Sequence, residues 1–97
     1  MAKGYWVVFY HAIKDQEKFQ AYAKAAAPVM QAAGARYVLR GMPSQVYEAG
    51  ENQRVVLLEF PSVAAAMATH DSPAYQAALK ALGDGAVRDI RIVEALE

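Results

Sequence analysis

The segment Tyr5–Tyr10, with the sequence YWVVFY, restricts the possible folds more than any other part of the chain. Aromatic and β-branched side chains favour a β-strand, in which successive residues point to opposite faces of a sheet. Bulky apolar side chains therefore lie on both faces: Tyr5, Val7 and Phe9 on one, and Trp6, Val8 and Tyr10 on the other. Such a strand belongs in the centre of a sheet that is covered on both sides.

Length and composition predict one packed domain over residues 1–97, because 56% of the residues are hydrophobic. Ten Lys and Arg residues balance ten Asp and Glu residues, so neither nucleic acid nor a membrane surface is expected as a partner. There is no cysteine, which excludes disulfides and thiolate sites. The N-terminal apolar run is too short to span a bilayer, and we expect a cytoplasmic protein.

The segment after the first strand has helical spacing. Asp15 is placed to cap a helix that ends at Gly34. Pro28 lies inside this helix and predicts either a kink or a second short helix that begins there. The apolar residues that recur on one helical face are Phe19, Tyr22, Ala23, Ala26 and Met30.

The middle of the chain reads as a bulged hairpin. ARYVLRG (35–41) and QVYEA (45–49) form one strand interrupted at GMPS, and GENQ turns the chain into RVVLLEF (54–60). Ser62 is placed to cap one helix, and Ser72 with Pro73 begins another that Gly83 ends. AVRDIRIVEAL (86–96) alternates as a last strand.

This order of elements, βαββαβ, predicts a ferredoxin-like α+β fold with a four-stranded antiparallel sheet, in which the first and third strands are central. Two helices cover only one face of such a sheet. The other face would expose a large apolar patch, so we predict a homodimer formed by sheet-to-sheet packing. The alternative is a monomer whose aromatic side chains line a half-exposed sheet.

Several short motifs resemble the domain-of-unknown-function family 1330, within the dimeric α/β-barrel superfamily. They are GYW at Gly4–Trp6, Asp15, Tyr22, RG at 40–41, Glu48, RVVLLEFPS at 54–62 and SPAYQ at 72–76. The resemblance implies a ferredoxin-like subunit that closes a barrel with a partner, and it implies no established reaction. Related families include cofactor-independent monooxygenases, heme-degrading enzymes and isomerases. The chain departs from the pattern at Thr69 and His70, where family members tend to have aromatic residues.

The adjacent His70, Asp71 and Ser72 raise the question of a nucleophilic triad. Triad members meet in space from separate parts of a chain, whereas three successive residues at a helix break point in different directions. Ser72 before Pro73 is explained as a helix cap, so we favour that interpretation.

Three residues are candidates for moving a proton: His70, His11 and Glu59. His70 ends a short helix, where a histidine could act as a base, a donor or a ligand, although we favour an exposed helix-end residue that interacts with the last carbonyls. His11 ends the first strand, and Glu59 interrupts an apolar central strand, where burial would raise its pKa or force it to pair. Two distant histidines predict no metal site, and no cofactor is predicted, although a single axial heme ligand stays open.

Arg40 is the preferred ligand contact, because its planar guanidinium can hold a carboxylate or an enolate. The alternative is an ion pair with Glu48 or Glu59. Aromatic side chains that could bound a pocket are Trp6, Tyr22, Tyr37 and Tyr75, although such residues are more often core. The alanine-rich helices favour a modest cavity.

We therefore carry three functional hypotheses. The first is a small-molecule site in each subunit of a homodimer, with acid/base or oxygenase-type chemistry that needs no cofactor. The second is a non-catalytic ligand-binding or accessory dimer, and the third is a purely structural dimer. A pocket that contains Arg40 together with a titratable group would favour the first hypothesis.

Overall fold

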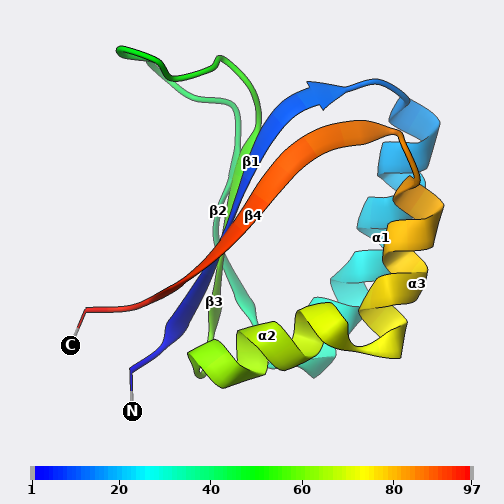
Figure 1. Cartoon of the computed structure of the whole chain (residues 1–97), viewed down its shortest axis with the longest axis vertical. Coiled ribbons are helices and arrows are strands. Elements are labelled where there is room, and N and C mark those ends of the chain that lie inside the picture. The colour runs from blue at the N-terminus through cyan, green and yellow to red at the C-terminus, as the bar shows by residue number, and fades with distance from the viewer. Residues whose placement is uncertain (1, 97) are drawn as a thin grey trace.

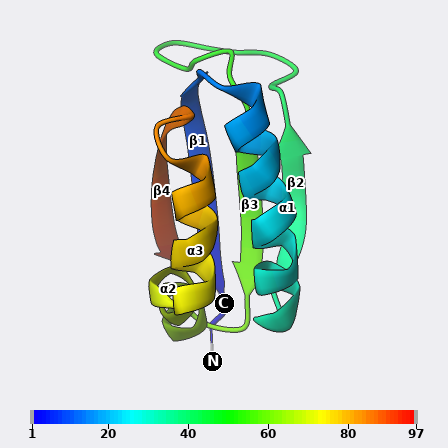
Figure 2. The ribbon, with the colours of Figure 1, turned by 90° about the vertical axis from the view of Figure 1, so that its right-hand side faces the viewer.

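The structure is a computed structural model that describes residues 2–96. A sheet and a layer of helices pack against each other, and the helices lie on one face of the sheet only (Figures 1 and 2). The elements in chain order are β1 Gly4–Ile13, α1 Gln16–Ala32, β2 Arg36–Gly41, β3 Val55–Phe60, α2 Val63–Asp71, α3 Pro73–Leu82 and β4 Ala86–Glu94. The order βαββαβ, with the second helix divided, is the one expected from the sequence.

The sheet is four-stranded and antiparallel with the order β2-β3-β1-β4. The two apolar strands β1 and β3 are therefore central, as predicted, and the strands with more charged residues are at the edges. The β2–β3 pairing shifts register between Tyr37 and Leu39, so an irregularity is present in this pair, but it lies before the predicted interruption at GMPS. The fold class is ferredoxin-like α+β, as the sequence indicated.

Helix α1 begins where the sequence predicts, because the Asp15 carboxylate accepts a hydrogen bond from the backbone N–H of Lys18 at 3.1 Å. Gly34 follows the helix with a φ of 76°, a conformation that glycine adopts without strain. Pro28 neither ends α1 nor begins a second helix, since α1 is one helix from Gln16 to Ala32. Pro28 is exposed, so its ring meets no packed neighbour in the described part of the chain. The helix continues past it because packing of the opposite, buried face stabilises the helix.

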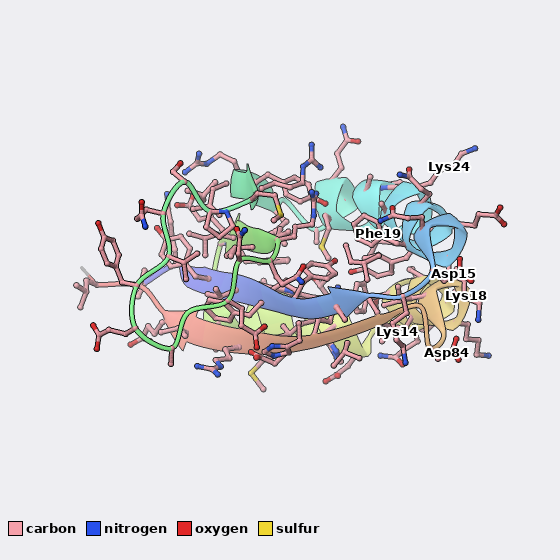
Figure 3. The ribbon with its side chains drawn as sticks, turned by 90° about the horizontal axis from the view of Figure 1, so that it is seen from above. Lys14, Asp15, Lys18, Phe19, Lys24 and Asp84 are labelled. Atoms are coloured by element: carbon pink, nitrogen blue, oxygen red, sulfur yellow. The ribbon has the colours of Figure 1, made fainter. Side chains whose placement is uncertain are left out.

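The break between α2 and α3 occurs at Ser72, as predicted. The Ser72 hydroxyl accepts a hydrogen bond from the backbone N–H of Tyr75 at 3.2 Å, while Ser62 caps α2 by accepting from Ala65 at 3.0 Å. At the far end of α3, Asp84 receives a hydrogen bond of 2.6 Å from Lys18 of α1. Figure 3 shows these two side chains together at that end of the helical layer.

The predicted strand QVYEA is wrong. Residues 42–54 form a loop, in which the backbone N–H of Gly50 donates to the Tyr47 carbonyl at 3.0 Å. Pro43 has no N–H to extend the β2 ladder, and the loop leaves the end of the sheet on the side away from the helices (Figure 1). Residues with β-propensity form a strand only when they pair with a neighbouring strand, and this segment has none beside it within residues 2–96.

The helices cover one face of the sheet and leave the other uncovered (Figure 1). On the covered face, Trp6, Val8 and Tyr10 are 0%, 2% and 4% exposed beneath the helices. On the other face, which we call the open face, no helix of residues 2–96 lies against the sheet (Figure 1). Its central residues are only half-buried: Tyr5, Val7 and Phe9 of β1, and Val55 and Leu57 of β3.

None of the helices within residues 2–96 combines the length and the apolar character that a membrane crossing requires.

Candidate functional site

A narrow cleft lies between α1 and the covered face of the sheet, with a cavity volume of about 60 Å³. Three arginines from three different places in the chain line it. We call it the arginine cleft and define it by Arg40, Arg54 and Arg88 together with Trp6, Tyr10 and Tyr22. Its small volume agrees with the modest cavity that the alanine-rich helices predict.

Arg88 reaches the cleft from β4, where it shares the covered face with Ile90 and Ile92 and lies opposite Tyr10 in the register. Its guanidinium donates hydrogen bonds to three tyrosine hydroxyls: to Tyr10 at 3.3 Å, to Tyr22 at 3.1 Å and to Tyr75 at 3.0 Å. It also lies 4.4 Å from the centroid of the Tyr22 ring. These contacts hold the charged group in one orientation.

The hydroxyls of Tyr22 and Tyr75 are 2.7 Å apart and share a hydrogen bond. Tyr75 is fully buried and Tyr22 is 7% exposed. Burial raises the pKa of Tyr22 far above its ordinary value, and the neighbouring Tyr75 raises it further against the opposing effect of Arg88. Burial also raises the pKa of Tyr10. Tyr10 and Tyr22 are therefore neutral donors at neutral pH.

The positive charges of the cleft have no acidic partners. Within residues 2–96, none of Arg40, Arg54 and Arg88 forms an ion pair with a carboxylate. Arg40 lies 4.6 Å from the centroid of the Tyr37 ring, so the alternative ion pair with Glu48 or Glu59 is absent. Although burial opposes the charge of Arg88, the surrounding tyrosine oxygens hold its pKa above the ordinary value, and it stays a cation.

Two N–H groups at the cleft are buried without a hydrogen-bond partner among residues 2–96. One is the indole Nε1 of Trp6 and the other is Nε of Arg54, whose guanidinium lies 5.5 Å from the Phe19 ring centroid. Buried donors are nearly always satisfied in native proteins. Two residues that line the cleft thus carry buried donors for which residues 2–96 supply no acceptor.

Glu59, a predicted acid or base, lies on the open face and is fully paired. It accepts hydrogen bonds from Arg36 at 3.3 Å, from Lys3 at 3.2 Å and from the Tyr5 hydroxyl at 3.1 Å. Arg36 and Lys3 hold the pKa of Glu59 below its ordinary value. Of the two outcomes expected from the sequence, pairing therefore occurs and an upward pKa shift does not.

His11 also lies away from the arginine cleft, in a second pocket of about 220 Å³ under the loop 42–54. Its ring nitrogens contact Glu51 at 2.8 Å and Asp89 at 3.0 Å, and Arg91 donates to Asp89 at 3.1 Å. The hydrogen bonds to Glu51 and Asp89 raise the pKa of His11. His11 thus connects the loop to the edge strand β4.

His70 packs beside the cleft without lining it. Its ring centroid is 5.6 Å from that of Trp6 and 5.2 Å from that of Tyr75, and its Nδ1 contacts Asp71 at 3.2 Å. The Ser72 hydroxyl instead donates to the Thr69 carbonyl at 2.7 Å while capping α3. Since His70 is not bonded to the serine, the triplet lacks the geometry of a triad.

The structure thus brings together one group of predicted residues and separates another. Arg40, Trp6, Tyr22 and Tyr37 line the cleft, and Tyr75 lies directly behind Tyr22. The proton-transfer candidates His11, Glu59 and His70 lie outside it. Within residues 2–96, no group of three or more acidic, histidine or cysteine side chains is arranged to hold a metal ion.

Three residues of the cleft were not anticipated as site residues: Arg54, Arg88 and Tyr10. A signal for the arginines is present in the sequence. Arg88 alternates in phase with Ile90 and Ile92, and Arg54 in phase with Val56 and Leu58, which places a charge on an otherwise apolar face. Charged residues at core positions indicate either pairing or a site.

Comparison with known proteins identifies a family and a fold. The family described as "Domain of unknown function (DUF1330)" matches residues 3–96. No protein of curated function matches the chain. Among solved structures, a protein of unknown function from Rhodopseudomonas palustris is 20% identical with a TM-score of 0.76, and the match covers 99% of this chain and 84% of that one.

Two further structures share the fold at lower similarity. A dimeric ferredoxin-like protein of unknown function from Thermobifida fusca is 13% identical with a TM-score of 0.61, covering 97% of this chain and 92% of that one. SnoaB, a cofactor-independent oxygenase from Streptomyces nogalater, is 14% identical with a TM-score of 0.58, covering 99% and 93%. At this identity the likeness shows the fold alone.

Proposed function

The chain belongs to the family of unknown function DUF1330, and we propose that it binds a small organic anion in the arginine cleft of each subunit of a homodimer. The observation that carries the proposal is the set of three arginines that line one cleft without an acidic partner among residues 2–96. A cation that is partly removed from water loses favourable hydration free energy, and attraction to an opposite charge offsets this loss. A bound anion would supply that charge.

The form of the cations favours an organic oxyanion. A guanidinium is planar and presents its N–H groups as a fork that matches two oxygens of a carboxylate or an enolate. The rest of the lining is apolar or aromatic, which suits a ligand with a hydrocarbon part. The apolar lining residues include Val8, Ala26, Met30, Val56 and Leu58.

The homodimer is supported by the open face. Its half-buried residues Val7, Phe9 and Leu57, with Leu39 and Val93 at 47% and 52% exposed, extend across all four strands. A contact between two such faces would approach the roughly 1,200–2,000 Å² of a stable interface. The structural neighbour from Thermobifida fusca is described as dimeric. Sedimentation at micromolar concentration should give the mass of two chains, and a single folded chain would contradict the assembly.

Oxygenase-type chemistry is a narrower possibility, suggested by the fold that the chain shares with SnoaB. Within residues 2–96, no histidine, aspartate or glutamate lines the arginine cleft. Tyr22 is a poor base because its pKa is raised. Any reaction in the cleft would therefore start from a ligand that is already ionised, and anion binding is the function that the residues support best.

Thermal unfolding and fluorescence of Trp6, the one tryptophan of the chain, test the proposal. Aliphatic carboxylates, aromatic carboxylates and inorganic phosphate are compared with chloride at equal ionic strength. A ligand at ten times its Kd should stabilise the protein by about 1.4 kcal/mol. Arg88→Gln should abolish the effect, and Arg40→Gln at the exposed mouth should weaken it. If no anion changes either signal relative to chloride, the proposal is wrong.

A further inference from the structure

The hydrogen-bonding groups of the arginine cleft specify the ligand further. We infer that the anion is a short aliphatic monocarboxylate, whose oxygens accept hydrogen bonds from the Tyr10 and Tyr22 hydroxyls beside Arg88, an inference that rests on the proposed function. It adds to that function the head group, the size of the ligand and the residues that contact it.

The hydroxyl protons around Arg88 outnumber their acceptors. Tyr10, Tyr22 and Tyr75 each have one hydroxyl proton, and each oxygen accepts from the Arg88 guanidinium. Among the residues that the structure describes, only one of these protons is used, in the hydrogen bond between Tyr22 and Tyr75. Tyr75 is fully buried and does not line the cleft, so it is the natural donor of that bond. The protons of Tyr22 and Tyr10 are then left for a ligand.

Two residues that line the cleft also carry buried side-chain groups without a partner among residues 2–96, and both groups are donors. The Nε1–H of Trp6 and the Nε–H of Arg54 are buried and have no acceptor among residues 2–96. Neither group can accept a hydrogen bond under any condition. A ligand that satisfies this set must bring acceptors only, which an ionised carboxylate does and a neutral amide or alcohol does not.

The available space limits the rest of the ligand. A water molecule needs roughly 10–15 Å³ measured in this way, so a cavity of about 60 Å³ holds roughly four to six heavy atoms. Apolar side chains such as Val8, Val56 and Met30 line the same space. A phosphate ion would place hydrated oxygens against them, whereas a chain of two or three carbons would bury apolar surface.

The Trp6 indole proton provides a direct test. Because the chain has one tryptophan, the ¹H–¹⁵N spectrum of the labelled protein contains one indole signal. Titration with butanoate should move this signal saturably, while butanamide, which has the same shape without the charge, and inorganic phosphate should bind at least tenfold more weakly. Tenfold corresponds to about 1.4 kcal/mol.

Two tyrosine variants test the contact residues. Tyr22→Phe keeps the ring and removes one donor, so it should weaken butanoate binding about tenfold. Tyr47→Phe is the control, because Tyr47 is 76% exposed in the loop 42–54 and does not line the cleft, so butanoate affinity should stay the same. Urea unfolding of both variants verifies that they fold.

The outcomes separate this inference from the proposed function. If butanoate binds and Tyr22→Phe has no effect, the assignment of the inner donors is wrong and anion binding stands. If phosphate or a larger aromatic carboxylate binds and butanoate does not, the ligand class is wrong while the proposed function stands. If no anion perturbs the cleft signals, both are wrong.

Discussion

The two faces of the sheet in this protein differ in whether their charged side chains are paired. On the open face the charged groups are paired: Glu59 with Lys3 and Arg36, and Asp89 with His11 and Arg91. On the covered face, three arginines line a cleft and none of them has an acidic partner within residues 2–96. The same four strands contribute to both faces, since successive residues alternate between them.

This difference indicates which kind of partner each face can bind. A surface whose charges are already paired can be covered by another apolar surface without leaving a charge unmatched. A cleft with unmatched cations and free N–H and O–H donors instead needs a ligand with negative charge and acceptors. This contrast is the basis for proposing a second copy of the chain on the open face and a small anion in the arginine cleft.

Gly4 lies close against the start of α2, and its substitution should have the largest effect on stability. A Cβ atom at Gly4 would lie 2.7 Å from the backbone N of Val63 and 2.8 Å from Ser62 backbone atoms, which cannot move without shifting α2. Gly4→Ala should lower the free energy of unfolding by about 3 kcal/mol in urea denaturation. Gly41→Ala, whose Cβ would meet nothing within 4 Å, is the control and should lose no stability. Equal effects at the two sites would contradict the close approach.

The neighbours Val8 and Val7 compare the two faces directly. Val8 is 2% exposed beneath the helices, so Val8→Ala should cost about 2 kcal/mol at every protein concentration. Val7 is half-buried on the open face, so Val7→Ala should cost little at high dilution and more as the dimer forms. Denaturation at several protein concentrations measures both. A Val7→Ala effect that does not depend on concentration would argue against a partner on the open face.

The smallest effect is expected from the titration of His11. Glu51 and Asp89 raise its pKa in the folded protein above the ordinary value of 6.5. The stability that its protonated form contributes is therefore fully present below about pH 6.5, and it is lost as the pH rises through the raised folded-state pKa. His11→Gln should flatten this part of the stability curve. An NMR titration midpoint of His11 at or below 6.5 would contradict the expectation.

Much of the fold follows from local signals in the chain. The caps at Asp15, Ser62 and Ser72 and the stop at Gly83 are short-range hydrogen bonds and backbone preferences, so they form where the sequence places them. The predicted strand QVYEA and the second helix that was one alternative at Pro28 do not form, for the opposite reason. A strand needs a partner that the loop does not meet, and the helix is stabilised by packing that outweighs one lost hydrogen bond.

The candidate site was only partly predictable. Arg40, Tyr22 and Trp6 were anticipated as ligand contacts, and the structure places all three at the arginine cleft. Arg88 was missed, because its place in the cleft depends on the pairing of β4 with β1, which brings together residues 78 positions apart. Such contacts are not encoded in any short stretch of the chain.

By itself the sequence determined the order of the elements, the central position of β1 and β3, and the apolar character of both faces of the sheet, since these depend on residue type and period. Only the tertiary structure decided that Arg40, Arg54 and Arg88 line one cleft without an acidic partner among residues 2–96, while Glu59 and His11 are paired on the other face. The physical reason is that charge pairing is a property of distance in space, and strand register and helix packing set that distance.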